Sequence, residues 1–303
     1  MSPGKKITVG TRASALALKQ TNAIIESLRL SNPGVEFVVN TIKTKGDKSQ
    51  DAALLTIGKG VFVKEIEDSL LSGEIDMAVH SLKDLLTVIP SGLALGAISE
   101  REDARDVLIN RWRLSLKDMP SGARIGTSSP RRAAFLKALR PDLIVLPMRG
   151  NVDTRLKKAA SEEYDGTILA AAGVIRMGRQ EEVTQYLPTE DFVPAVGQGA
   201  LAVEIREDDK GTLAVVSKVN HQPTSTAVTA ERSFLAALGG GCAVPVAAYG
   251  KLEKNRLRLV AAAASEDGKR IFRVSLDAGV TNPQKAGEKL ARALLDSGAS
   301  EIL

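Results

Sequence analysis

Residues 5–42 read KKITVGTRASALALKQTNAIIESLRLSNPGVEFVVNTI, and this stretch decides the fold class. Residues 7–9 are typical of a strand, and apolar side chains then recur at helical spacing over residues 15–28 until Asn32-Pro33-Gly34 ends the pattern. Val35–Ile42 returns to strand character. The stretch therefore predicts a strand–helix–strand unit, the building block of an α/β sheet.

Two further stretches repeat this alternation. After the first unit, apolar residues at helical spacing end at Gly73, and residues 75–79 form the next expected strand. A hydroxyl cap followed by an early proline is typical of a helix start. The second stretch contains a strand over residues 124–127, a helix that begins at Ser128-Ser129-Pro130, a strand over 143–146, a helix capped by Asn151 that runs to Glu162, and an apolar segment over 166–172.

The C-terminal part has a different pattern. A helix from Thr224 to Leu238 is followed by three strand-like segments, residues 246–252, 256–264 and 270–276, and by a final helix over 283–297. Consecutive strands are typical of an antiparallel sheet. The sequence therefore predicts an α/β fold with two α/β lobes, followed by a small C-terminal α+β domain with a three-stranded sheet.

The composition is that of a globular protein in a reducing compartment. The 303 residues are 44% hydrophobic and include one cysteine, which excludes an internal disulfide. No apolar run reaches the roughly 18 residues of a membrane helix, and the chain begins without the apolar stretch of a signal peptide. The net charge of +5 is modest, and 3% aromatic residues disfavour nucleic-acid binding by base stacking. We expect a cytoplasmic protein without membrane or nucleic-acid partners.

Several familiar motifs are absent or misleading. Residues 197–202 fit the dinucleotide-binding fingerprint, but they lead into a strand-like segment, 201–205, rather than into a helix. The chain contains no Walker A sequence and no Gly-x-Ser-x-Gly elbow. Only His80 and His221 accompany the single cysteine, so we expect no zinc site and no other metal.

Arginines are concentrated where the expected strands give way to helices. The residues are Arg131, Arg132, Arg149, Arg155 and Arg176. Ligands of open α/β sheets bind at that edge, and the arginine fork binds carboxylates through two parallel hydrogen bonds. The pattern indicates an anionic ligand, although an ordinary surface charge is the alternative for any single arginine.

The single cysteine lies in the segment Gly239-Gly240-Gly241-Cys242-Ala243-Val244-Pro245. Glycines leave space around a neighbouring side chain, so the thiol of Cys242 is open to a bulky group. The alternative is a buried cysteine that acts as a small hydrophobic residue. The local sequence leaves both interpretations open.

Seven segments, taken in order, resemble the porphobilinogen deaminase family, whose members are also called hydroxymethylbilane synthases. The segments are residues 10–18, 58–65, 80–84, 126–132, 149–155 and 197–199, and the one around Cys242. The resemblance covers essentially the whole chain. It implies a transferase that joins four porphobilinogen molecules head to tail, with release of ammonia, to give hydroxymethylbilane in haem-type tetrapyrrole biosynthesis.

The resemblance also implies a cofactor and a catalytic acid. Dipyrromethane would be held by a thioether to Cys242, and the glycines would leave space for its two pyrroles and the growing chain. Asp84 matches the family's catalytic aspartate, and a carboxylate against pyrrole N–H groups stabilises the positive charge that develops during bond formation. Without the resemblance, a loop or helix-capping aspartate is the alternative.

The growing chain carries two carboxylates per ring, and such a polyanion needs many cationic and hydroxyl partners. Helix starts add backbone N–H groups to these partners. The resemblance implies a cofactor- and substrate-binding set of Arg12, Ser14, Lys59, Phe62, Ser81, Lys83, Thr127, Ser128, Ser129, Arg131, Arg132, Arg149, Arg155, Arg176 and Gln198.

The family's organisation implies three domains. Domain 1 comprises residues 1–100 and 195–218, domain 2 comprises 101–194, and domain 3 comprises 219–303. The first two domains would share the hinged architecture of the two-domain periplasmic binding proteins. The protein is expected to be a monomer that binds porphobilinogen and the growing chain, with residues 43–59 as a mobile loop over the cleft.

Two departures from the family pattern qualify these expectations. Leu86 stands where the family usually has proline, and the loop near Thr56 is short and lacks a lysine. Two alternative functions are a non-catalytic two-lobe protein that binds small anions and a basic nucleic-acid-binding protein. The first does not explain a third domain with a displayed cysteine. The second predicts binding to DNA or RNA that weakens steeply with salt.

Overall fold

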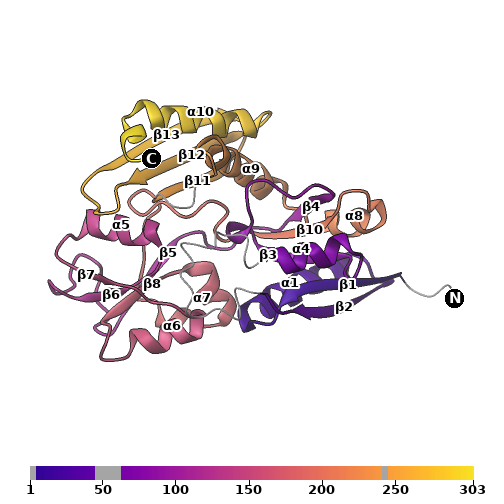
Figure 1. Cartoon of the computed structure of the whole chain (residues 1–303), viewed down its shortest axis with the longest axis horizontal. Helices are drawn as coiled ribbons and strands as arrows, with labels where there is room; N and C mark the ends of the chain where they lie inside the picture. The colour runs from indigo at the N-terminus through magenta and orange to yellow at the C-terminus, as the bar shows by residue number, and fades with distance from the viewer. Residues whose placement is uncertain (1–4, 45–62, 241–244) are drawn as a thin grey trace. The chain divides into compact units, whose positions relative to one another are not determined.

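In the computed structural model, the chain folds into two compact units (Figure 1). The structure describes residues 5–44, 63–240 and 245–303. One unit is Met1–Glu102 with Ala200–Ser225, and the other is Asp103–Gly199 with Thr226–Leu303. The chain therefore passes between the units three times. The division into three domains stays a prediction.

Some of the predicted site residues lie outside the described part of the chain. These are Lys59, Phe62 and Cys242, together with most of the expected mobile loop over residues 43–59 and the short region near Thr56. Within the described ranges, no helix is both long and apolar enough to cross a membrane.

The first unit contains a five-stranded mixed sheet. The strand order is β2-β1-β3-β10-β4, in which β1 runs parallel to β2 and β3, and β10 runs antiparallel to β3 and β4. Its elements are β1 (Lys5–Arg12), α1 (Ala15–Ser31), β2 (Val35–Ile42), α4 (Lys64–Leu71), β3 (Met77–Ser81), β4 (Leu93–Ile98), β10 (Leu201–Arg206) and α8 (Lys210–Val216). The predicted strand–helix–strand unit is confirmed.

Helices α1 and α4 cover opposite faces of this sheet. On β3, Val79 packs in the cluster that includes Leu28 of α1, whereas its neighbour Ala78 packs in the cluster that includes Leu70 of α4. Successive side chains of a strand point to opposite faces. Because both faces of the sheet are buried, ligand-binding side chains are expected at the ends of the strands.

The second unit contains a sheet with the same arrangement. The order is β7-β6-β8-β5-β9, in which β6 runs parallel to β7 and β8, and β5 runs antiparallel to β8 and β9. In each sheet three neighbouring strands are parallel, the fourth runs antiparallel to them, and the fifth pairs antiparallel with the fourth. The two predicted α/β lobes are therefore confirmed. The elements are β5 (Asp106–Asn110), β6 (Arg124–Gly126), α5 (Pro130–Leu139), β7 (Ile144–Leu146), α6 (Val152–Ala159), β8 (Gly166–Ala170), α7 (Ala171–Met177) and β9 (Gln185–Tyr186).

The C-terminal part of the second unit is the predicted α+β domain with three antiparallel strands. Its elements are α9 (Gln222–Ala237), β11 (Val246–Glu253), β12 (Arg256–Ala264), β13 (Ile271–Gly279) and α10 (Pro283–Asp296). On β12, Ala261 and Ala263 pack in the cluster that includes Leu290 of α10. Ala262 and Ala264 belong to the core cluster of the adjoining lobe. This sheet is therefore also buried on both faces.

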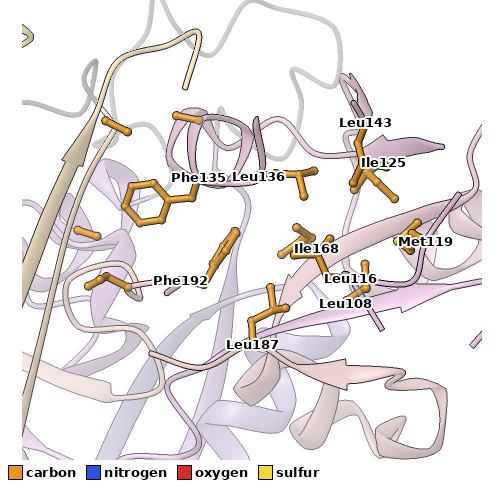
Figure 2. Close-up of a cluster of buried hydrophobic side chains, with 14 of the residues drawn as sticks. Leu108, Leu116, Met119, Ile125, Phe135, Leu136, Leu143, Ile168, Leu187 and Phe192 are labelled. Carbon is orange, nitrogen blue, oxygen red and sulfur yellow. The ribbon is translucent and has the colours of Figure 1, made fainter. Parts of the chain in front are cut away.

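The core cluster of that lobe holds helix α5 in place (Figure 2). Phe135 of α5 packs edge-to-face against Phe192, with ring centroids 5.7 Å apart and an interplanar angle of 85°. Such aromatic pairs contribute beyond the area that they bury. Both rings are fully buried, together with Ile168 of β8. Helix α5 is thus anchored through its apolar face, and its first residues are fixed at the end of β6.

The predicted helix starts are confirmed by their caps. Ser129 accepts a hydrogen bond from the backbone of Arg132, and Asn151 accepts one from Thr154. Helix α6 ends at Ala159, earlier than the predicted Glu162. Ser161 donates its hydroxyl hydrogen to the carbonyl of Lys158 at 2.7 Å, a local bond that competes with helix continuation.

Gly287 lets α10 approach α9 closely. A Cβ at this position would lie 2.1 Å from the carbonyl oxygen of Ala230 and 2.8 Å from the backbone nitrogen of Phe234. Gly287→Ala is expected to lower the free energy of unfolding by about 3 kcal/mol, because the helix backbone must move. The loss is measured by thermal unfolding. Gly279→Ala, whose Cβ would meet nothing within 4 Å, is the control. Equal midpoints for the two variants would contradict the close approach.

Candidate functional site

The carboxyl edge of the first sheet carries four of the predicted site residues. Arg12 ends β1, Ser14 caps α1, and Ser81 ends β3. Because β1 and β3 pair in parallel, these strand ends are neighbours. The amide of Gln20 on α1 donates to the hydroxyl of Ser81 at 2.9 Å, which ties the helix to the strand end. Half-buried Lys83 follows in the next turn.

Asp84 lies in the short 3-10 turn that follows β3, Leu82–Asp84. Leu82 and Leu85 on either side are buried, and the backbone nitrogen of Leu82 donates to the carbonyl of Ala200 at 3.0 Å. The two leucines therefore anchor the turn, and the Asp84 side chain is exposed. Leu86, at the position where the family resemblance predicts proline, is 41% exposed just beyond this anchor.

The carboxyl edge of the second sheet carries the other predicted hydroxyl groups. Thr127, Ser128 and Ser129 connect β6 to α5. The backbone nitrogen of Ser129 donates to the hydroxyl of buried Thr127 at 3.2 Å, and the hydroxyl of Ser128 donates to the carbonyl of Met148 at 3.1 Å. These bonds fix the turn that presents the N-terminus of α5, where backbone N–H groups favour an anion.

Three further arginines come from the two neighbouring strand–helix junctions at this edge. Arg149 follows β7, and Arg155 on α6 donates through Nε to the carbonyl of Gly150 at 2.8 Å. Arg176 on α7, the helix after β8, donates to the carbonyl of Gly199 at 2.7 Å. All three side chains are half-buried. Because β6, β7 and β8 are parallel, their carboxyl ends bring these arginines to one edge of the sheet.

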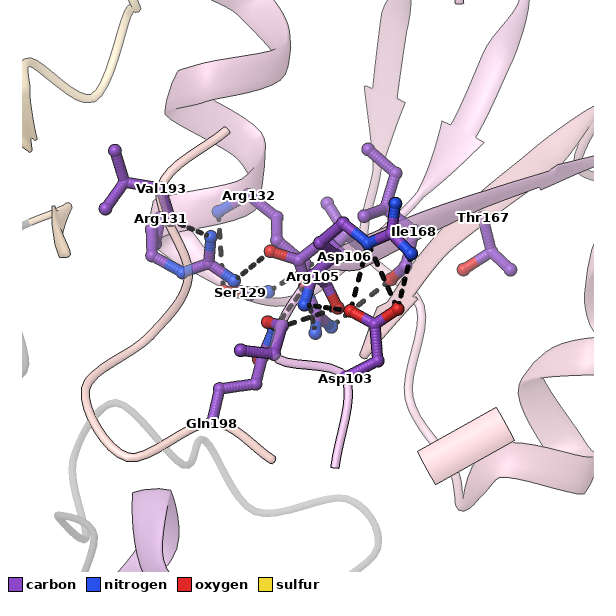
Figure 3. Close-up of polar contacts among 12 residues, drawn as sticks. Asp103, Arg105, Asp106, Ser129, Arg131, Arg132, Thr167, Ile168, Val193 and Gln198 are labelled. Atoms are coloured by element: carbon purple, nitrogen blue, oxygen red, sulfur yellow. Dashed lines mark hydrogen bonds and ion pairs between the residues drawn. The ribbon is translucent and has the colours of Figure 1, made fainter. Parts of the chain in front are cut away.

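Arg131 and Arg132, at the start of α5, converge on Asp106 (Figure 3). Arg131 Nη2 lies 2.7 Å from Asp106 Oδ2, and Arg132 Nε lies 2.8 Å from Asp106 Oδ1. Both arginines are 6% exposed, and Asp106 is completely buried. Burial lowers the pKa of Arg131, and the charge of Asp106 opposes that shift. The structure therefore gives these two arginines an internal carboxylate partner.

Gln198, which was predicted to bind cofactor or substrate, is buried behind this cluster. Its side-chain nitrogen donates to the carbonyl of Ala104 at 2.8 Å and lies 3.2 Å from Asp106 Oδ1. The described contacts of Gln198 therefore hold Asp106. A binding role for Gln198 stays a prediction.

Glu231 fixes the two elements that flank the segment containing Cys242. It lies on α9, is completely buried, and accepts hydrogen bonds from the backbone nitrogens of Gly197 and Gly250, each at 2.7 Å. Gly250 belongs to β11, which follows that segment. A carboxylate that accepts two backbone N–H groups is held firmly. The helix before the cysteine segment and the strand after it are thereby joined.

Sequence reasoning missed Asp106, Glu231 and Gln20. One signal was present for Asp106: it begins a strand whose next three residues are apolar, and a buried arginine pair needs a counter-charge. For Glu231 and Gln20 the helical pattern gives no comparable signal, because their partners are backbone or hydroxyl groups distant in the sequence.

His80, Glu204 and Glu67 form a second buried cluster of ionisable side chains, within the first unit. His80 Nε2 lies 3.0 Å from Glu204 Oε2, and both side chains are almost inaccessible. Burial raises the pKa of Glu67 on α4, the charge of Glu204 raises it further, and His80 opposes the shift. The cluster links β3, β10 and α4, which agrees with a structural role for His80.

Glu67→Gln is expected to raise the midpoint of thermal unfolding near pH 8 but not near pH 4. The folded-state pKa of Glu67 lies above its ordinary value of 4.5, so the stability that protonated Glu67 contributes is present at low pH and lost as the pH rises through the folded-state pKa. Glutamine cannot ionise, so the difference between the unfolding midpoints of Glu67→Gln and of the unchanged protein should increase with rising pH. Exposed Glu26→Gln on α1 is the control. A difference that does not vary with pH would rule out this origin.

Two α/β sheets with cationic and hydroxyl side chains at their carboxyl edges are typical of proteins that bind anionic ligands. Residues 7–214 match the family model described as "Porphobilinogen deaminase, dipyromethane cofactor binding domain", and residues 225–296 match "Porphobilinogen deaminase, C-terminal domain". The porphobilinogen deaminase of Syntrophomonas wolfei is 49% identical over 300 residues, 99% of this chain and 98% of that protein. The chain belongs to the porphobilinogen deaminase family.

A second relative gives the same result. The porphobilinogen deaminase of Bacillus subtilis is 48% identical over 302 residues, 99% of this chain and 96% of that protein. Among solved structures, the methionine-binding protein MetQ covers 82% of this chain and 99% of its own, with 11% identity and a TM-score of 0.45, too weak a likeness to bear on the fold. The family polymerises porphobilinogen to hydroxymethylbilane in tetrapyrrole biosynthesis and uses a dipyrromethane cofactor. The predicted family, activity and cofactor are confirmed.

Proposed function

We propose that this chain performs the family's reaction with Asp84 as the catalytic carboxylate and Cys242 as the attachment point of dipyrromethane. Arginine, lysine and hydroxyl side chains bind the carboxylates of the cofactor and of the growing chain. They are Arg12, Ser14, Lys59, Ser81, Lys83, Thr127, Ser128, Ser129, Arg131, Arg132, Arg149, Arg155 and Arg176, with Phe62 and Gln198 as further contacts.

The observation that carries this proposal is the grouping of arginines at the second sheet. Three neighbouring strand–helix junctions place Arg131, Arg132, Arg149, Arg155 and Arg176 at one edge. Dipyrromethane carries acidic side chains, and guanidinium groups bind carboxylates in a fixed geometry. The residues present therefore fit the cofactor. Its chemistry, when bound, is to supply the pyrrole carbon at which chain growth starts.

Asp84 is suited to the catalytic role by its position. The buried leucines on either side hold its turn, so the exposed carboxylate can meet a pyrrole N–H without a large rearrangement. A carboxylate fixed beside these nitrogens stabilises positive charge as it develops on the ring and accepts or returns a proton. Lys83 beside it binds an acid group of the substrate.

The cellular setting follows from the chemistry of the cysteine. A thioether-forming cysteine must remain reduced until the cofactor is attached, and the cytoplasm keeps thiols reduced. We therefore assign the enzyme to the cytoplasm, as a monomer whose only small-molecule partners are porphobilinogen and its linear products.

Intact mass and product analysis of one sample test the proposal. The purified protein should carry a covalent adduct of two pyrrole units and should convert porphobilinogen to hydroxymethylbilane with release of ammonia. A two-lobe anion-binding protein without catalysis would carry no adduct and release no ammonia. That result would overturn the proposed function.

A further inference from the structure

The arginine pair on α5 is organised around one buried carboxylate. Arg131 and Arg132 are consecutive helical residues, and consecutive helical side chains do not normally face one another. Here both guanidinium groups nevertheless reach Asp106, which comes from β5 on the neighbouring part of the sheet (Figure 3). The shared contact with Asp106 therefore holds the two guanidinium groups together.

Asp106 is placed at the ligand-binding edge by the antiparallel direction of β5. It is the first residue of that strand and pairs with Ala170, the last residue of parallel strand β8. The amino end of β5 thus lies beside the carboxyl ends that carry the arginines. A parallel strand in this position would have placed its first residue at the opposite edge.

Each Asp106 oxygen has a defined partner. Oδ2 accepts from Arg131 Nη2 at 2.7 Å, whereas Oδ1 lies 2.7 Å from Arg132 Nη2, 2.8 Å from Arg132 Nε and 3.2 Å from the amide nitrogen of Gln198. The guanidinium groups also donate to main-chain carbonyls, Arg131 to Val193 at 2.7 Å and Arg132 to Ile168 at 3.2 Å. The planes of both guanidinium groups are therefore fixed before any ligand binds.

Among the residues that the structure describes, the charges of this cluster do not cancel. Two guanidinium groups and one carboxylate sum to +1, and all three side chains are at most 7% exposed. An uncompensated buried charge favours an anionic partner. One carboxylate of a cofactor would bring the sum to zero, and fixed guanidinium planes would receive it with little loss of side-chain entropy.

We propose that Asp106 is a positioning residue for cofactor loading, which holds Arg131 and Arg132 so that the pair receives a carboxylate of dipyrromethane. The inference rests on the proposed binding role of these two arginines. Asp106 itself repels a carboxylate and does not bind it. Its effect is transmitted through the guanidinium groups, and Gln198 acts one step further back by holding Asp106.

Asp106→Asn tests the inference, with Asp165→Asn as the matched control. Asp165 is in the same unit and pairs with Arg124, with Oδ2 3.0 Å from Nε, and with Arg111, and both arginines lie outside the cluster. Each variant is purified from the same host, and the fraction of chains with the two-pyrrole adduct is measured by intact mass beside the midpoint of thermal unfolding. Both variants should have lower midpoints. Only Asp106→Asn should lose loading, by about tenfold, because the amide presents a donor to a guanidinium donor.

Three outcomes decide the matter. Normal loading of Asp106→Asn while Arg131→Leu and Arg132→Leu fail to load would overturn the positioning role and leave the proposed function intact. Normal loading of both arginine variants would instead remove the arginines from the proposed site. If Asp106→Asn does not fold, Gln198→Leu decides, since it keeps all three charges and removes one donor to Asp106. It should load several-fold less than the unchanged protein, and full loading would overturn the inference.

Discussion

Cys242→Ser is expected to yield a folded protein that carries no pyrrole adduct and forms no tetrapyrrole. Serine differs from cysteine by one atom, so the change is small, but a hydroxyl is a far weaker nucleophile than a thiolate at neutral pH. The elements before and after this segment are joined by Glu231 of α9, which accepts a hydrogen bond from the backbone nitrogen of Gly250 in β11. The fold should therefore survive the loss of the cofactor anchor.

Intact mass, circular dichroism and steady-state turnover of the same sample check this expectation. The unchanged protein should show the added mass of two pyrroles, and Cys242→Ser should show the mass of the chain alone with an unchanged far-ultraviolet spectrum. Because the chain contains one cysteine, no second thiol can take over. An adduct on the serine variant would place the attachment point elsewhere and would remove Cys242 from the proposed site.

The parts of the fold that depend on local sequence were predictable. The strand–helix–strand unit at the N-terminus, the helix caps at Ser129 and Asn151, and the three C-terminal strands were expected close to their observed bounds. In each of these cases the deciding interactions lie within a few residues of one another. Periodicity and capping residues therefore carry enough information.

The strands that complete each lobe were not all predicted, because they depend on distant pairing. Strand β10 was expected as a strand, but its place between β3 and β4 is set by pairs such as Val203 with Val79. Strands β4, β5 and β9 were not identified at all. The antiparallel direction of β5, which brings Asp106 to the binding edge, follows from its pairing with β8 and has no local signature.

The candidate site, like the fold, has features that depend on local sequence and features that depend on distant contacts. Arginines at strand–helix junctions can be identified from the sequence, because each junction is formed by residues close together in the chain. Open α/β sheets in general bind their ligands at the carboxyl ends of the strands. The partners of these arginines cannot be identified in this way. The sequence does not distinguish the buried pair, Arg131 and Arg132, from half-buried Arg149, because burial and the contact with Asp106 arise only when β5 and α5 pack together.

Asp84→Asn is expected to reduce steady-state formation of hydroxymethylbilane by about a hundredfold to a thousandfold while the protein keeps its cofactor. Asparagine keeps the size of the side chain and removes the charge that stabilises the electron-poor ring. The turn should not change, since buried Leu82 and Leu85 hold it and Asp84 is exposed. The expected loss is therefore one of turnover and not of folding or loading.

Turnover and intact mass are measured together for Asp84→Asn, with Asp68→Asn as the matched control. Asp68 is an exposed aspartate of the same unit, on α4, and among the described residues it forms a surface ion pair with Lys64 at 3.5 Å. It receives the same chemical change, and surface ion pairs of this kind contribute little to stability. The control should keep both turnover and adduct, whereas Asp84→Asn should keep the adduct, with pyrroles beyond the first two where elongation stops midway. Turnover by Asp84→Asn within a fewfold of the control would show that another group stabilises the charge, because the two variants differ only in which aspartate has lost it.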